Sequence, residues 1–178
     1  MKKNIAIVAV FLLSLALLAA AQQDKSQRPS PPANAECKFP DGKTIKVDYS
    51  SPRMRGRKIF GGLEPYGKVW RTGANEATSF VTDADLTVSG KEVPAGSYTL
   101  FTIPNPDKWT LIINKKTGEW GIPYKYEADE LARVDMQVSK TPVPVENFTI
   151  GFDQMGDACN LRLDWENTRS TVEFAEKK

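Results

Sequence analysis

The chain of 178 residues contains no histidine. This absence excludes Ser-His-Asp and Cys-His catalysis, histidine-ligated zinc sites and acid–base chemistry by imidazole. An enzyme built on this sequence would have to use carboxylates, lysine or tyrosine. Only two cysteines are present, and we expect them to pair with each other. The sequence therefore predicts neither a metal site nor a cofactor.

Long apolar runs are also scarce, with one exception at the N-terminus. Residues 1–21 combine two lysines, an apolar run over 5–18 and the small residues Ala19–Ala21. This order is typical of a secretory signal peptide that is cleaved before Gln22. An uncleaved anchor is the alternative, but the run is short for a membrane span. No later stretch is apolar enough to span a membrane, so we expect a periplasmic or extracellular protein.

A strong excess of charge of one sign is absent too. The chain has 24 basic and 22 acidic residues, and loss of residues 1–21 removes two lysines and no acid. A neutral mature chain argues against bulk attraction to nucleic acid or anionic membranes. The partners that we expect are an unidentified small molecule, either anionic or a carbohydrate, or a protein of the cell envelope.

The mature part divides into a tether and one β domain. Residues 22–35 are rich in Gln, Ser, Pro, Asn and Ala, which predicts a flexible tether. Residues 36–176 show apolar side chains at alternate positions, with turn residues at short intervals, and only 127–133 briefly looks helical. About nine or ten short strands indicate an antiparallel β-sandwich, with a jelly roll or a barrel as alternatives.

Cys37 and Cys159 are expected to form a disulfide in an oxidising compartment. Each alternates with apolar residues of its own strand, so both should face the core. A bridge would close a loop of over 120 residues and stabilise the fold by roughly 4–5 kcal/mol in the chain-entropy model. Two buried free thiols are the alternative.

The turn around Asp41-Gly42 sets the register of the first hairpin. A three-residue loop over 41–43 pairs Phe39 with Ile45 and Cys37 with Val47, which keeps one face apolar. A two-residue turn would pair Phe39 with Thr44, which places Cys37 and Phe39 on the face opposite Ile45 and Val47. We therefore predict the three-residue loop.

Residues 51–76 fit no periodicity. They hold five of the twelve glycines, and six basic residues against two acids. Connections of this length are usually functional or disordered. The segment carries apolar anchors, which disordered segments lack, so we predict an ordered functional loop.

Several short motifs of this chain occur together in one known family. They are Ser51-Pro52-Arg53, Gly56-Arg57, Ile59-Phe60-Gly61, Pro65-Tyr66-Gly67, the run Trp70–Thr78, Pro94–Leu100, Trp109 with Ile112 and Asn114, and Trp120-Gly121. In these motifs the chain resembles bacterial exported proteins grouped as domain of unknown function 2911, over roughly residues 36–174. The resemblance implies an exported β domain and carries over neither an activity nor the cysteine pair.

The loop supplies the candidates for a binding site. Those that we nominate as ligand-binding are Arg53, Arg57, Trp70, Arg71, Asn75 and Glu76. The guanidinium of an arginine can donate two parallel hydrogen bonds to a carboxylate, phosphate or sulfate. Trp70 or Tyr66 can stack on a flat ligand. Alternatively, the arginines tie the loop down by bonding backbone carbonyls or acids such as Glu76 or Asp164.

Two further interpretations stay open. Trp120, Tyr124 and Tyr126 crowd one loop and can form a platform for a carbohydrate, or simply pack on each other. A hydrolase using paired carboxylates is the other, with Glu76 as the one nominated catalytic residue and its partner unplaced. The sequence favours a small-ligand or partner-binding module over an enzyme, and a purely structural or interaction domain remains a further alternative.

Overall fold

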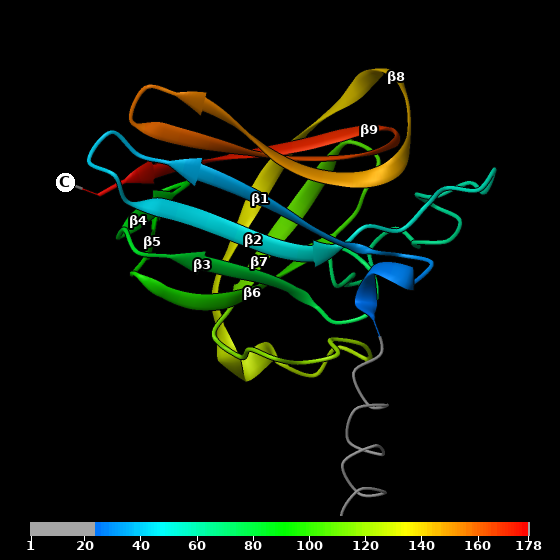
Figure 1. Ribbon diagram of the computed structural model, residues 1–178, viewed down its shortest axis with the longest axis horizontal. Coiled ribbons are helices and arrows are strands. Elements are labelled where there is room, and N and C mark those ends of the chain that lie inside the picture. Colours follow the sequence, from blue (N-terminus) through cyan, green and yellow to red (C-terminus); the bar gives the residue numbers. More distant parts are fainter. Residues whose placement is uncertain (1–23, 178) are drawn as a thin grey trace, which may run out of the picture.

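The computed structural model describes residues 24–177 and shows one antiparallel sheet of nine strands. The strands are β1 (Pro32–Lys38), β2 (Thr44–Ser50), β3 (Thr78–Thr82), β4 (Leu86–Val88), β5 (Lys91–Val93), β6 (Gly96–Ile103), β7 (Lys108–Asn114), β8 (Glu130–Met155) and β9 (Ala158–Glu176). Their order across the sheet is β1-β2-β3-β6-β7-β8-β9-β4-β5 (Figure 1), so the sheet is not closed into a barrel. The all-β prediction is confirmed. The predicted signal peptide over 1–21 lies outside the described residues.

The main core lies on one face of the sheet, where alternate residues point inward. Ile45 and Val47 of β2, Phe80 of β3, Leu100 of β6 and Leu111 of β7 are all fully buried there. This spacing is the period of two that a half-buried strand requires. The alternation seen in the sequence therefore identifies the inner face correctly.

The middle strands are covered on their second face as well. Phe101 of β6 and Ile112 of β7 point away from the main core and pack with Tyr126. The connection over 115–129 covers this face, as the yellow-green loop below the sheet in Figure 1 shows. Burial on both faces explains why these two strands read as nearly continuous apolar runs.

Strands β8 and β9 form one long hairpin, 26 and 19 residues in length. The sequence predicts only short strands, and this is wrong here, because the alternating stretches over 134–138 and 148–152 both belong to β8. The ladder shifts register between Lys140 and Val145 and again before Thr149, and Glu166 of β9 has a left-handed φ of 55°. Such irregularities bend a strand without ending it. The hairpin folds back, and its distal part, residues 145–166, lies beside β1 (Figure 1).

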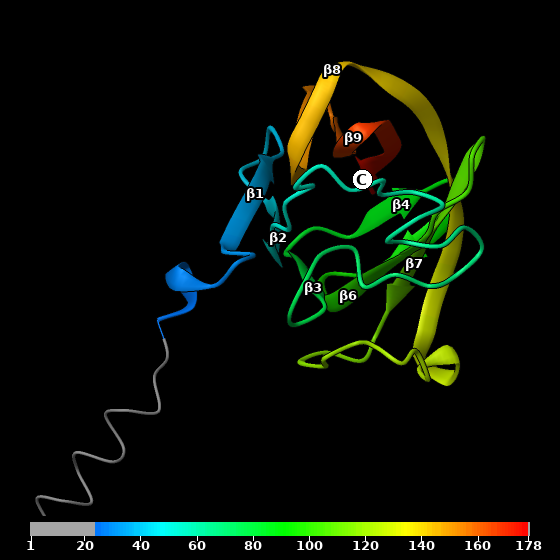
Figure 2. The ribbon, with the colours of Figure 1, turned by 90° about the vertical axis from the view of Figure 1, so that its right-hand side faces the viewer.

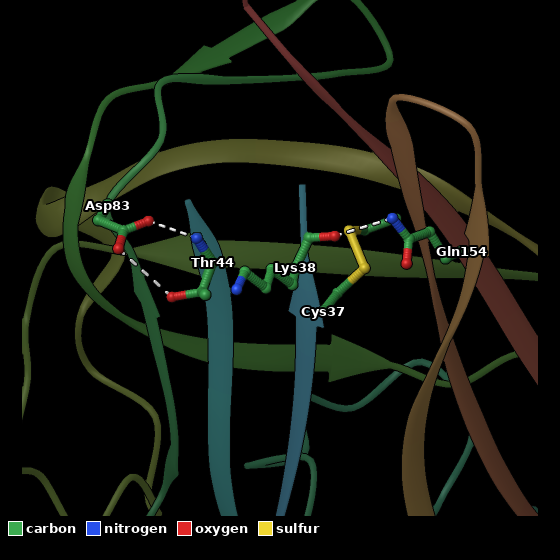
Figure 3. The surroundings of a disulfide bond; sticks show 6 residues. Cys37, Lys38, Thr44, Asp83 and Gln154 are labelled. Atoms are coloured by element: carbon green, nitrogen blue, oxygen red, sulfur yellow. Dashed lines mark hydrogen bonds between the residues drawn. A yellow bond between two sulfur atoms is a disulfide. The ribbon is translucent and has the colours of Figure 1, made fainter. Parts of the chain in front are cut away.

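The disulfide between Cys37 and Cys159 is confirmed. It joins β1 to β9 across 122 residues of sequence, and both cysteines are buried. Beside it, the Gln154 side chain donates a hydrogen bond of 2.8 Å to the carbonyl of Lys38 (Figure 3). The bridge therefore fastens the distal hairpin to the first strand of the sheet, where no strand ladder joins β1 to β8 or β9 in residues 24–177.

The predicted register of the first hairpin is wrong by two residues. Cys37 pairs with Ile45, and the Phe39 amide donates to the Lys43 carbonyl at 2.8 Å, so the loop is 40–42. Gly42 makes this turn possible because its φ is 97°. A shift of two keeps each side chain on its face, which is why the apolar pattern did not distinguish the two registers.

Two boundaries also differ from the predictions. Residues 32–35, assigned to the tether, form the first half of β1, because an open edge of β2 is available for pairing. Of the helical stretch over 127–133, only Glu127–Asp129 forms a 3₁₀ turn, named η2, and β8 begins at Glu130. A second 3₁₀ turn, η1, spans Lys25–Gln27. No helix within residues 24–177 is long and apolar enough to cross a membrane.

Candidate functional site

The segment over 51–76 is an ordered path without regular strands, seen clearly in Figure 2. Isolated backbone pairs hold it at intervals. Met54 donates to the carbonyl of Glu146 at 2.8 Å, and Trp70 and Thr102 exchange hydrogen bonds of 2.8 and 2.9 Å. The loop therefore rests on β8 near its start and on β6 near its end.

Trp70 belongs to the core and not to a ligand site. Only 4% of it is exposed, and its ring stacks on Trp165 at 5.8 Å between centroids. Phe148 lies edge-on at 4.8 Å, and the indole N–H donates to the carbonyl of Gly73 at 3.0 Å. With both ring and N–H engaged, this residue anchors the loop.

Arg53 and Arg57 fold the start of the loop onto itself. Arg53 donates to the hydroxyl of Ser51 at 2.9 Å and to its carbonyl at 3.3 Å. Arg57 donates to the carbonyls of Met54 at 3.0 Å and Arg53 at 2.7 Å. These bonds satisfy carbonyls that have no strand partner. The geometry of these two arginines thus favours the structural alternative over ligand binding.

Asn75 and Glu76 hold the segment that precedes β1. The Asn75 amide donates to the Ser30 carbonyl at 3.0 Å. Arg28 reaches both Glu76 oxygens at 2.8 and 3.0 Å, and Lys25 lies 3.2 Å from one of them. Hydrogen bonds from its own backbone amide and then from Arg28 lower the pKa of Glu76 to about 2. A carboxylate held ionised in this way is a weak base, so its setting gives little support to a catalytic role.

Arg71 differs from the other nominated arginines. Its guanidinium carbon lies 5.2 Å from the ring centre of Trp120, and one N–H makes a long bond of 3.4 Å to the Trp120 carbonyl. No other hydrogen bond of this guanidinium is present within residues 24–177. Partial burial lowers its pKa, opposed by Glu64 and Glu76. Most of its five donors thus remain available for a ligand.

The backbone around Arg71 is tightly held. Thr72 adopts a left-handed φ of 56°, which is a genuine outlier for a β-branched residue. Its hydroxyl contacts that of Thr102 at 3.1 Å, and its carbonyl accepts from Thr78 at 2.7 Å. Strain of this kind persists only where the surroundings fix it, and it clusters at functional sites.

Glu64 is the site residue that the sequence interpretation missed. Burial raises its pKa to about 7, against the lowering effect of Arg71 and Arg57. Its backbone is fixed in a tight turn, with bonds from Glu64 to the Ile59 carbonyl and from Gly61 to the Glu64 carbonyl. The sequence does distinguish this residue, since Glu64 is the only acid between residues 51 and 75 and stands among several basic residues.

The aromatic connection over 115–129 mostly packs on itself. Tyr124 and Tyr126 lie 5.7 Å apart, edge to face, and both contact Phe101. Tyr124 also donates to Glu130, and burial raises its pKa. Trp120 is 55% exposed. The three aromatic residues therefore form no common platform, and Trp120 instead joins Arg71.

No metal centre is evident in the described part of the chain. Within residues 24–177, no three His, Cys, Asp or Glu side chains gather closely enough to hold an ion. The arrangement that stands out is Arg71, Glu64 and Trp120, which we call the Arg71 site. It offers a cation with spare donors, an acid whose pKa is raised by burial to about 7, and an exposed flat ring.

A comparison with protein families matches residues 30–174 to the family described as "Protein of unknown function (DUF2911)". No curated protein and no solved structure matches the chain.

Proposed function

The chain belongs to the DUF2911 family of proteins of unknown function, and from this premise we propose that it is an exported module that binds a small organic anion at the Arg71 site. The buried disulfide supports export, since such bonds persist in oxidising compartments. The observation that carries the proposal is the guanidinium of Arg71, half-buried over an exposed indole with most donors unused.

The ligand class follows from the chemistry of the three side chains. A guanidinium fork matches the two oxygens of a carboxylate or the oxygens of phosphate and sulfate. Trp120 offers a flat apolar surface beside the charge, which favours an anion attached to a planar group. Glu64 competes for the same cation when it ionises, so binding should weaken as pH rises through about 7.

Benzoate, inorganic phosphate and sulfate serve as probes, titrated into the mature protein by calorimetry. Arg71→Ala should weaken binding of benzoate about 10- to 100-fold, the range expected for losing a charged hydrogen bond. Trp120→Ala should weaken benzoate but spare phosphate, because only the ring contact is lost.

Arg133→Ala is the matched control, since Arg133 is exposed and paired with Glu130. It removes the same charge and should leave every probe unaffected. The proposal fails if no probe binds the wild type, or if Arg133→Ala weakens binding as much as Arg71→Ala. If Arg71→Ala unfolds the protein, Arg71→Lys is the second variant, because it keeps the charge but loses the bidentate guanidinium. Binding of benzoate as tight as in the wild type would then contradict the proposed role of the guanidinium.

A further inference from the structure

A second candidate site lies where the sheet splits. The ladder between β8 and β9 ends at the pair Gln137–Thr171, which lies near the start of β8 and the end of β9. Beyond it, β9 pairs only with β4 on its other edge, through Thr87 and Ala175. The facing edges of β8 and β9 are left without ladder partners there, and a cavity of about 500 Å³ opens at this place.

We call this space the split-sheet cavity. It is lined mainly by polar side chains from β4 and its turn, from β8 and from β9. The polar side chains of the lining are Thr87, Ser89, Asp135, Gln137, Asn160, Thr171 and Glu173, and Met155 also lines the cavity. An adjoining hollow of about 600 Å³ shares Ser89, Asp135 and Gln137. The volume falls in the range of small-ligand sites.

Most of the polar side chains that line the cavity have no hydrogen-bond partner within residues 24–177. Asp135 pairs with Lys108 at 3.0 Å. The other six polar side chains make no hydrogen bond to protein within residues 24–177. Amides, hydroxyls and a carboxylate thus converge on one space with their donors and acceptors unused.

The charge of the lining selects against anions. Two carboxylates and no arginine or lysine line the main cavity. Gln137 and Asn160 each offer both donors and acceptors, and Glu173 offers acceptors for paired hydroxyl groups. Met155, 61% exposed, supplies an apolar contact for a ring face. A neutral ligand with many hydroxyl groups satisfies this set.

We propose that the split-sheet cavity binds a neutral saccharide, one or two sugar units in size. The site is separate from the Arg71 site and takes a ligand of different charge. Gln137 and Asn160 provide the main hydrogen bonds, from β8 and from the distal part of β9. Binding would therefore also join the two parts of the bent hairpin.

The test is saturation-transfer NMR and calorimetry on the mature protein with glucose, galactose, N-acetylglucosamine, maltose and cellobiose. At least one sugar should bind, and Gln137→Ala and Asn160→Ala should each weaken it about tenfold. Neither side chain holds the fold by a hydrogen bond, so both variants should fold. Asn34→Ala, in β1 and outside the lining of the cavity, is the amide-matched control and should bind as the wild type does.

Two further probes separate the competing explanations. Spermidine tests a cationic ligand, and glucuronate tests an anionic one. The proposal is overturned if no neutral sugar binds, if both cavity variants bind normally, or if spermidine alone binds and is lost in Glu173→Gln. Arg71→Ala should leave sugar binding intact, so failure here is distinguishable from failure of the Arg71 site.

Discussion

Trp70 and Trp120 occupy opposite environments: Trp70 is buried in the core and Trp120 is exposed at the Arg71 site. Trp70→Ala should reduce the free energy of unfolding by about 3–5 kcal/mol, because it leaves a large cavity among packed aromatic rings. Trp120→Ala, at an exposed ring, should change it by no more than about 0.5 kcal/mol. Urea unfolding monitored by circular dichroism measures both. Equal losses in the two variants would contradict the assignment of Trp70 to the core and Trp120 to the surface.

Glu64 should make stability depend on pH in an unusual direction. Its pKa in the folded chain is about 7, against an ordinary value of 4.5. The unfolded chain therefore ionises first, and this group's contribution to stability is lost as pH rises from 4.5 to 7. Glu64→Gln should remove the effect, so the variant gains roughly 1–3 kcal/mol relative to wild type between pH 4.5 and 8.

The measurement is urea unfolding of both proteins across this pH range, with Glu36→Gln as a control for loss of an exposed acid. Only the difference between variant and wild type counts, because other acids titrate in both. A difference that stays flat with pH would show that Glu64 has an ordinary pKa.

Single residues also show where sequence reasoning reached its limit. For the arginines of the irregular loop, the sequence leaves ligand binding and a structural role open as alternatives. Arg53 and Arg57 donate to carbonyls of the loop, and no composition rule distinguishes them from Arg71. The difference depends on which side chains the fold brings near, such as Trp120, which is distant in sequence.

At the scale of elements, Arg28 and Lys25 hold the segment over 24–31 to Glu76. We call this segment the strap. Arg28→Ala should cost about 0.2–1 kcal/mol at pH 7, the usual worth of an exposed ion pair. The pair is present above about pH 4.5 and is lost as pH falls through the lowered pKa of Glu76, near 2. The difference between variant and wild type should therefore vanish in strong acid.

Carboxyl NMR titration gives the sharper readout for this strap. In Arg28→Ala the pKa of Glu76 should rise but stay below 4.5, because its own backbone amide still donates. Lys25→Ala, which removes the longer and more exposed contact, should shift it less. A pKa unchanged by Arg28→Ala would mean that the strap does not hold this carboxylate.

Element boundaries followed the sequence only where local chemistry determines them. Alternation located β2 and β3, because burial on one face imposes a period of two. Nearly continuous apolar runs located β6 and β7, because both of their faces are buried. The length of β8 was missed, because exposed residues at the bend, including Val143, resemble a loop in sequence. The same limit hid the split-sheet cavity, which depends on which strand β9 pairs with.

At the scale of the molecule, one open sheet encloses a core by folding back on itself. The distal hairpin reaches β1 without extending the ladder, so a side-chain hydrogen bond and the disulfide hold the two together. The all-β class and the cysteine pair were both predictable from alternation and compartment. The arrangement that gives the pair its position was not, since it depends on the bend in β8 and β9.

Replacing both cysteines by alanine should therefore loosen the contact between β1 and the distal hairpin before it affects the rest of the sheet. The bridge closes a loop of 122 residues, so its loss should cost about 4–5 kcal/mol by the chain-entropy estimate. Amide hydrogen exchange should quicken in β1 and in the distal hairpin over 145–166, because the contact between them loses its covalent link. Exchange in β6 and β7 should rise only with global unfolding, since these strands are paired on both edges.

Gln154→Ala is the matched control, removing the neighbouring hydrogen bond while leaving the bridge, and should cost about 1 kcal/mol. Uniform acceleration across all strands would show that the disulfide stabilises the whole sheet equally and does not hold one contact.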